Sequence, residues 1–340
     1  MGNCKFFSIL GGLLMIMVAS LWAGTPTQVS FVDGEVSLKP ASGASRDLNP
    51  GDKLNTGDTV RTGADGVAEL DQKGVILKLS PKTVFTLTER ESGGKQRDVV
   101  AVAVGSMKMK YEKLSGTEPL IRTASCSAGV RGTEISVFSG EDGSSLIAVD
   151  SGSVEISAEG KTVSLEVGEA VEVRPGQAPG DKFTLHSDQV DYRTWNDDRV
   201  KSMLADPVKS LGGLRAQLES YIKDASNFDA AHSESSARLE AERQKLLVLK
   251  KDQGEEAFNK YRDEVVTPLS FETAFQVLNT RYFALAAYSL RRYVAGRLYL
   301  QLKPLALTGN PVWTQFRKDY QDFLDSYEHS IVPHLVEADF

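Results

Sequence analysis

Histidine, cysteine and carboxylate side chains are the groups in this sequence that could carry out chemistry. The four histidines are His186, His232, His329 and His334. His329 and His334 are five residues apart, which is poor spacing for one helical face, and Pro333 lies between them. The sequence has no His-x-x-x-His or Cys-x-x-Cys spacing for zinc, no nucleophile elbow, no phosphate-binding loop and no dinucleotide fingerprint. It therefore predicts no catalytic residue, no metal and no cofactor, although the many carboxylates leave a glycosidase-like pair open.

Two cysteines, Cys4 and Cys126, set the thiol chemistry. Cys4 lies in the N-terminal leader, so Cys126 has no intramolecular partner if the leader is removed. We expect Cys126 to be a small buried side chain in a strand. A reactive or intermolecular thiol is the alternative.

A glycine-containing stretch lies at the centre of the N-terminal half. Its residues are Gly129, Val130, Arg131, Gly132, Thr133 and Glu134. Two glycines around a Val-Arg pair predict a tight turn between two strands, with both glycines in the turn. Arg131 and Glu134 are expected to form an internal tie that pins this turn, and binding of a partner is the alternative role. Because a β-branched residue resists positive φ, Gly132→Val should destabilise the domain by roughly 2–3 kcal/mol.

The motif Leu-Asn-x-Gly-Asp occurs twice, at residues 48–52 and 54–58. Each copy is expected to bury its leucine and to place a Gly-Asp pair at a turn that the aspartate caps. The turn residues are Gly51, Asp52, Gly57 and Asp58. No single short loop gathers the several oxygen ligands that calcium requires.

Hydrophobic patterning divides the chain into two parts after the leader. Residues 25–185 contain short alternating runs separated by glycine and aspartate, which predict an all-β domain, as a sandwich, barrel or solenoid. Two prolines and two glycines over residues 174–180 indicate a linker. Residues 186–340 then follow a helical period, so we expect an α+β multidomain protein whose second domain is an all-α bundle.

The second domain contains the signals of several helices. The expected helices cover residues 190–204, 208–228, 233–251, 255–266, 268–302 and 313–329. Asp206 is expected to cap the second helix, with Pro207 at its first position. Aromatic residues are frequent and arginines lie near them. These aromatic residues are Tyr282, Tyr288, Tyr293, Tyr299, Trp313, Tyr320 and Tyr327. Core packing is the expected role, and an aromatic-arginine surface for a partner is the alternative.

The first 24 residues have the layout of a secretory signal peptide. Lys5 precedes an uncharged run over residues 6–22, and the run ends at Ala23. We expect residues 1–24 to be a signal peptide cleaved after Ala23, with an uncleaved N-terminal anchor as the alternative. No later stretch is long and apolar enough to span a bilayer. The protein is therefore expected in the periplasm or cell envelope of a bacterium.

Net charge excludes one class of partner. The 340-residue chain has a formal net charge of -7, and neither half is basic. The electrostatic signature of a nucleic-acid-binding protein is therefore missing.

Residues 29–173 resemble the FecR-type domain, the extracytoplasmic domain named after the ferric-citrate regulator of bacteria. The resemblance is carried by Leu54-x-x-Gly57-Asp58-x-Val60-x-Thr62-Gly63, Asp65-Gly66-x-Ala68-x-Leu70, Arg122-Thr123 with Ala128 to Glu134, Asp150-Ser151-Gly152-Ser153-Val154 and Leu165-x-x-Gly168-Glu169. It implies a β domain outside the cytoplasm. Regulators of this family also carry a membrane span and a cytoplasmic segment that binds a sigma or anti-sigma factor.

The sequence favours binding over catalysis. Only five residues precede the uncharged run, so we expect no cytoplasmic arm and instead an exported binding or scaffold protein with a protein or envelope partner. Membership of an envelope sensing system is a further hypothesis for its role. A membrane-anchored regulator that transmits an extracytoplasmic signal is the first alternative. An enzyme acting on cell wall or glycans is the second.

Overall fold

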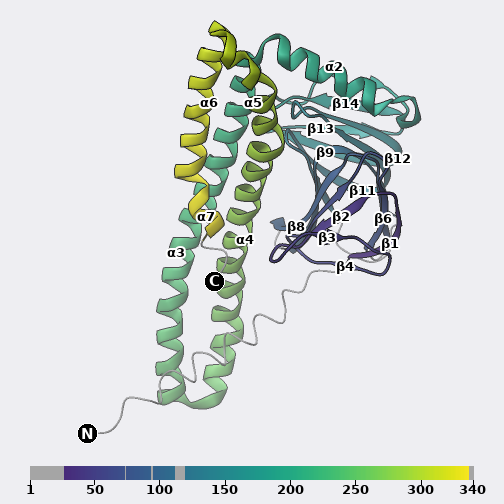
Figure 1. Ribbon diagram of the computed structural model, residues 1–340. Helices are drawn as coiled ribbons and strands as arrows, with labels where there is room; N and C mark the ends of the chain where they lie inside the picture. The colour runs from purple at the N-terminus through teal and green to yellow at the C-terminus, as the bar shows by residue number, and fades with distance from the viewer. Residues whose placement is uncertain (1–26, 73, 93–94, 112–118, 337–340) are drawn as a thin grey trace.

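The computed structural model describes residues 27–72, 74–92, 95–111 and 119–336. Strands fill the N-terminal part of the described chain and long helices fill the C-terminal part, as the sequence predicts (Figure 1). The expected signal peptide, residues 1–24, lies outside the described residues.

The β-rich region contains fifteen described strands. They are β1 Thr27–Asp33, β2 Val36–Lys39, β3 Arg46–Asp47, β4 Lys53–Leu54, β5 Thr59–Thr62, β6 Val67–Gln72, β7 Val75–Leu79, β8 Val84–Ser92, β9 Lys95–Tyr111, β10 Leu120–Arg122, β11 Ser127–Ser139, β12 Ser145–Ala158, β13 Lys161–Glu166, β14 Glu169–Val173 and β15 Phe183–Thr184. All of them join one sheet, whose main path is β15-β14-β12-β11-β10-β9-β7-β6-β1-β4. β13 pairs with β12, and β8, β5, β2 and β3 branch from β9. Only the β9–β10 pair is parallel among these described pairings.

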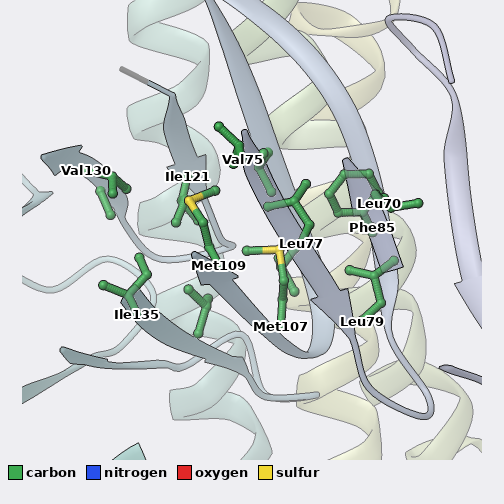
Figure 2. Packing of buried hydrophobic residues seen from close by; sticks show 14 of the residues in the cluster. Leu70, Val75, Leu77, Leu79, Phe85, Met107, Met109, Ile121, Val130 and Ile135 are labelled. Atoms are coloured by element: carbon green, nitrogen blue, oxygen red, sulfur yellow. The ribbon is translucent and has the colours of Figure 1, made fainter. Parts of the chain in front are cut away.

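The sheet curls around a hydrophobic core made by alternate residues of its strands. In β6 and β7, every second side chain is buried. Figure 2 shows Leu77, Met107, Met109, Ile121 and Ile135 from four strands of the sheet pointing into this core. Each of these side chains is at most 1% exposed. Because a fully buried large apolar side chain contributes about 1.5–3 kcal/mol, this alternation supplies the main driving force for the β region.

The β9 strand runs through a glycine without ending. A strand over 99–104, a break at Gly105 and a second strand are what the sequence suggests, but β9 is continuous. Gly105 has φ +109, and a Cβ there would lie 2.4 Å from the Thr83 backbone. Before Gly105 the strand pairs with β8, and after it the strand pairs with β7 and β11. The glycine therefore bends one strand between two sets of partners.

The helical region begins after residue 186. Its elements are η1 Ser187–Gln189, α2 Tyr192–Ala205, α3 Pro207–Tyr261, the π-helical η2 Arg262–Val266, α4 Thr267–Ser289, the π-helical η3 Leu290–Ala295, α5 Gly296–Leu302, η4 Lys303–Thr308, α6 Pro311–Ser330 and α7 Val332–Val336. The expected cap of α3 is present, because the Asp206 side chain accepts a hydrogen bond from Lys209 N and Pro207 occupies the first turn.

The helices expected over residues 208–228 and 233–251 form one continuous helix, so their separation is wrong. The break expected between residues 251 and 255 is present inside α3, because Gly254, with φ 86 and ψ -171, is not helical and divides the 55-residue element at a kink. Residues 228–233 contain no glycine or proline that would end a helix. Leu204 of α2 is 37% exposed, and the buried residues of that helix are Asn196 and Met203. The spacing of Trp195, Val200 and Leu204 predicts that all three face inward, and for Leu204 this prediction is wrong.

Helices α3, α4, α5 and α6 enclose a second hydrophobic core. Phe316 and Phe323 of α6 are fully buried in it, together with Leu218 of α3 and Leu290 of η3. In Figure 1, α3 and α4 continue past the end of this core as a two-helix extension that projects away from the β region. We call this extension, residues 230–281, the arm. Its own small core contains Leu239, Leu246, Val266 and Leu269.

Candidate functional site

The central stretch, expected to be a turn, lies inside strand β11. Gly129 is paired in regular register with Leu120 of β10 and Glu155 of β12, so it does not lie in a turn. The departure from regular pairing comes at Gly132 and Thr133, which together face Gly152 of β12. Two residues opposite one make a β-bulge, and Gly132 has φ +59 there. The turn expectation is therefore corrected to a bulge, which also needs a glycine with positive φ.

The bulge lies where β11 changes partner. Before it, residues 127–129 pair with β10, and after it, residues 134–139 pair with β9. β12 follows on the other side along the whole length. A bulge bends and twists its strand, so this one lets β11 cover two neighbouring strands in turn.

The described side chains around the bulge are satisfied within the fold. Val130 and Thr133 are 1% exposed, and Thr133 Oγ1 donates to the Ser153 carbonyl at 3.0 Å. Glu134 N donates to Ser151 Oγ at 2.9 Å. The Arg131 side chain lies outside the described part of the structure, so its expected tie to Glu134 is not described.

Glu134 instead pairs with a lysine on the neighbouring strand. Its Oε1 lies 2.9 Å from Lys108 Nζ, and the same ammonium lies 3.4 Å from Asp150 Oδ2. The hydrogen bond to Glu134 and the charge of Asp150 raise the pKa of Lys108. These three charges join β9, β11 and β12, so the contact that fixes the end of the bulge is an ion pair between strands.

The two Gly-Asp motifs form the same turn twice. Asp52 Oδ2 accepts from Asn49 N at 2.9 Å, and Asp58 Oδ2 accepts from Asn55 N at 2.9 Å. In both turns the aspartate N–H returns a hydrogen bond to the asparagine carbonyl. Gly51 and Gly57 precede the aspartates with φ +90 and +92.

Each aspartate side chain also contacts a residue outside its own turn. Asp58 Oδ1 accepts from Ala41 N at 2.9 Å. Asp52 Oδ2 lies 2.6 Å from the Arg46 guanidinium, which together with Asn49 N lowers the pKa of Asp52. The carboxylates therefore act as backbone acceptors in the described structure.

Cys126 is buried, but it does not lie in a strand. It ends the connection from β10 to β11, and its N–H donates to Thr123 Oγ1 at 3.1 Å. Burial raises the pKa of its thiol to about 11. A thiol this buried and this weakly acidic is a poor nucleophile.

Aromatic and arginine side chains join the β region to the helices. The Arg61 guanidinium donates to Tyr293 Oη at 3.0 Å, and Arg90 and Arg122 each lie over the Tyr282 ring, at 4.8 and 5.2 Å. Within α4–α6, Arg291 lies over Tyr327. These aromatic residues therefore pack internally, as the core-packing interpretation predicts, and do not form one outward surface.

A second set of polar contacts ties α2 and α5 to the edge of the sheet. Arg199 lies 2.7 Å from Glu172, and Arg297 lies 3.0 Å from Glu141. The Glu141 N–H also donates to Asn196 Oδ1 at 2.9 Å. Tyr192 Oη donates to the Ser139 carbonyl at 2.9 Å, and burial raises its pKa. The helical region is thus fastened to the sheet at several separate places.

The arm carries apolar side chains on its outside, which the sequence reading missed. Leu247 and Val248 of α3 are 56% and 58% exposed, and Phe271 and Val277 of α4 are 39% and 42% exposed. The helix period over 268–302 identifies an apolar face that contains Phe271, but it cannot show that this part of the helix extends beyond the elements that would cover that face.

The seam between the two arm helices is partly polar. Ser235, Thr273 and Thr280 are buried there. Both threonine hydroxyls donate to carbonyls of their own helix, Leu269 O and Gln276 O. Polar residues in the seam add little hydrophobic packing energy between the two helices. The exposed apolar side chains of the arm are candidates for contact with another chain.

Two classes of site have no candidate among the described residues. No group of three or more His, Cys, Asp or Glu residues there could hold a metal ion. Nor does any helix within those residues have the length and apolar character needed to cross a membrane.

The fold and its contacts define a β domain with a bulged central strand, fastened to a helical region with a projecting arm. Residues 58–155 match the family model described as FecR protein, so the chain carries a FecR-family domain. The match begins at Asp58, the last residue of the second Gly-Asp turn, and contains the whole of the bulge.

Two solved structures are similar to this chain, both described as a "putative anti-sigma factor" from Parabacteroides distasonis. One has 15% sequence identity and a TM-score of 0.33, and covers 38% of this chain and 61% of its own. The other has 16% identity and a TM-score of 0.34, and covers 40% and 63%. The chain thus spans less than two thirds of the length of either. A comparison with curated proteins found no match.

Proposed function

We propose that this protein is an exported binding or scaffold protein of the bacterial cell envelope, in which a FecR domain anchors a helical arm that binds a protein partner. The observation that carries the proposal is that four apolar side chains of the arm, Leu247, Val248, Phe271 and Val277, are exposed. Singly exposed apolar residues are ordinary, but four on one two-helix extension favour a protein interaction.

The FecR domain acts as the base in this proposal. Its bulge and its Gly-Asp turns are satisfied internally, which suits a rigid platform better than a reacting site. The contacts Arg61–Tyr293 and Arg199–Glu172 fix the helices on that base. A rigid base lowers the entropy cost of presenting the arm to a partner. We propose no catalytic step.

The partner is expected to offer an apolar helix face. Both helices of the arm expose apolar residues, and a further helix can pack its own apolar face against such residues. Exposed charges of both signs flank the apolar residues on the arm, among them Lys245, Glu255 and Glu272. The partner should therefore carry mixed charges at the rim of its apolar face.

Photo-crosslinking tests this proposal. A photoreactive amino acid at Val248 should capture one protein in intact cells, and that protein, once purified, should bind the wild-type chain in solution. Leu247→Glu with Val248→Glu should weaken this binding at least tenfold, since two charges would enter an apolar interface. The matched control is Ser233→Glu with Ser236→Glu, two exposed positions on the same helix.

Equal binding by both double variants would rule out the arm as the docking surface. No binding by the purified wild-type chain would rule out the captured protein as its partner.

The location is part of the proposal, and its support is the uncharged run that follows Lys5. The mass of the mature protein tests it: cleavage after Ala23 gives a chain that begins at Gly24. A chain that keeps residues 1–24 and sediments with membranes would instead favour the membrane-anchored regulator.

A further inference from the structure

A buried arginine lies at the junction between the FecR domain and α4. Arg122, at the end of β10, is 4% exposed. Its Cζ lies 5.2 Å from the centroid of the Tyr282 ring, which is itself 3% exposed. A guanidinium stays protonated in proteins, so the junction contains a positive charge out of contact with bulk water.

Arg122 lacks the counter-ion that two arginines elsewhere between the helices and the β region have. Arg199 of α2 and Arg297 of α5 each lie within 3.0 Å of a glutamate. Among the described residues, no carboxylate forms an ion pair with Arg122. The buried Nε atoms of Arg122 and Arg199 both lack a hydrogen-bond partner there, but only Arg199 has a carboxylate beside its guanidinium. The Tyr282 ring offers a cation–π contact, but it accepts no hydrogen bond from Nε. Burial of a charge is costly unless the charge is paired and hydrogen-bonded.

A small cavity adjoins the guanidinium. It lies between the sheet and α4, has a volume of ≈ 10 Å³, and is lined by Arg122, Thr86, Ala101, Thr123, Ala286 and Ser289 among others. About this volume is needed to hold one water-sized ligand. No lining residue is a carboxylate. The occupant must therefore be very small, and the only formal charge that lines the space is positive.

Two further arginines lie near Arg122. Arg90 lies over the same Tyr282 ring at 4.8 Å, and Arg97, its cross-strand neighbour, has a buried Nε with no partner among the described residues. Acidic groups also lie near these arginines: Asp224 of α3 is close enough to Arg90 to feel its charge, and Glu89 and Asp98 form the neighbouring cross-strand pair. None of these three lines the cavity.

The hydroxyls that line the cavity have little left to offer. Ser289 Oγ donates to the Leu285 carbonyl at 2.9 Å, and Thr123 Oγ1 already contacts Cys126 and accepts from Ser145. Thr86 Oγ1 shares a hydrogen bond of 3.0 Å with Thr59 Oγ1. The guanidinium therefore remains the main donor into the cavity.

We propose that this cavity binds one small monatomic anion of the chloride class, held by the Arg122 guanidinium between β10 and α4. The anion neutralises the buried charge and accepts the hydrogen bond that Nε otherwise lacks. Its site lies across the junction, so occupancy stabilises the attachment of α4 to the FecR domain. The proposal does not depend on what the arm binds.

Bromide replaces chloride as the probe in the first experiment. Crystals of the protein grown in sodium bromide should give an anomalous peak within hydrogen-bond distance of Arg122 Nε. The melting temperature should rise with sodium bromide or chloride, and saturate, relative to sodium gluconate at equal ionic strength. A site occupied only by water, with no anomalous peak, would overturn the proposal.

Substitution of the arginine gives the second experiment. Arg122→Met keeps the length of the side chain and removes its charge, so the halide-specific rise in melting temperature should disappear. Arg199→Met, which removes a paired arginine between α2 and β14, should leave that rise intact. If Arg122→Met does not fold, Arg122→Lys should fold, because it keeps the charge. This variant should need at least threefold more halide to reach half of the halide-specific rise in melting temperature.

A bromide peak without any halide-specific effect on melting would mean an adventitious ion only, and would also overturn the proposal. So would a halide effect that is unchanged in whichever Arg122 variant folds.

Discussion

Gly132 and Gly152 face each other across the β11–β12 pair, and a Cβ atom on Gly152 would stand 2.4 Å from the Gly132 carbonyl oxygen. Both glycines have positive φ, +59 and +75. The bend of the central strand therefore depends on two residues without side chains at the point where their backbones approach most closely.

Substitutions at these two glycines should differ in effect. Gly132→Val should lower the free energy of unfolding by about 2–3 kcal/mol, since no atom crowds its Cβ and only the positive φ is strained. Gly152→Ala should lower it by at least as much, because its Cβ would also press on the Gly132 backbone. Urea unfolding gives both values.

Gly129→Ala is the matched control for this pair. Gly129 has no positive φ and open space at its Cβ, so the change should stay within about 0.5 kcal/mol. A loss at Gly129 equal to that at Gly132 would contradict the assignment of the bulge.

The first Gly-Asp turn should make stability depend on acid pH. Hydrogen bonds from Arg46 and Asn49 lower the pKa of Asp52 in the folded state. A carboxyl with a depressed folded pKa stabilises the fold above its unfolded pKa of about 3.9, and that stabilisation is lost as pH falls through the folded value. The melting-temperature advantage of wild type over Asp52→Asn should therefore be full near pH 6 and shrink below about pH 4. An advantage that is constant from pH 6 to pH 2.5 would argue against the ion pair.

The strand pattern could be predicted from the sequence because inward and outward residues alternate and turns carry glycine and aspartate. The bulge could not be told from a turn in the same way. A glycine with positive φ occurs in turns and in bulges alike. Gly132 is in a bulge because β11 is paired on both sides of it, at Gly129 with Leu120 of β10 and at Glu134 with Lys110 of β9. Those partners come from other strands, so local sequence does not reveal them.

The contacts of the junction were also beyond a local reading. Arg122 and Tyr282 lie far apart in the sequence, and each alone looks like an ordinary strand arginine or a core tyrosine. The arm was missed for a related reason. The helix period of α3 can show which face is apolar, but Leu247 is exposed because the helix extends past its neighbours.

The junction should depend on one buried hydroxyl. Tyr221 Oη of α3 donates to the Ala124 carbonyl at 3.0 Å, and Tyr221 is 8% exposed. Tyr221→Phe leaves that carbonyl without its donor, so the free energy of unfolding should fall by about 1–2 kcal/mol. Tyr299→Phe is the control, since no hydrogen bond is made by its hydroxyl among the described residues, and it should change stability by less than about 0.5 kcal/mol. Equal effects of the two changes would mean that the Tyr221 bond adds nothing.

Cys126 should be chemically silent while the protein is folded. Its side chain is buried, and burial raises the pKa of the thiol to about 11. At pH 8, roughly one thiol in a thousand would then be ionised, against about one in four for an unperturbed cysteine with a pKa of about 8.5.

A thiol-exchange reagent measures this directly in a Cys4→Ser variant. We expect no prompt reaction of Cys126 in the folded protein and one equivalent after unfolding in guanidinium chloride. A cysteine placed at exposed Ser236 of α3 is the control, and should react within minutes in the folded state. Because reaction of Cys126 requires the β10–β11 connection to open, its slow rate should rise as the Gly132→Val change lowers the stability of the neighbouring strand. Prompt labelling of folded Cys126 would instead mean that the connection opens without loss of the strand pairing around it.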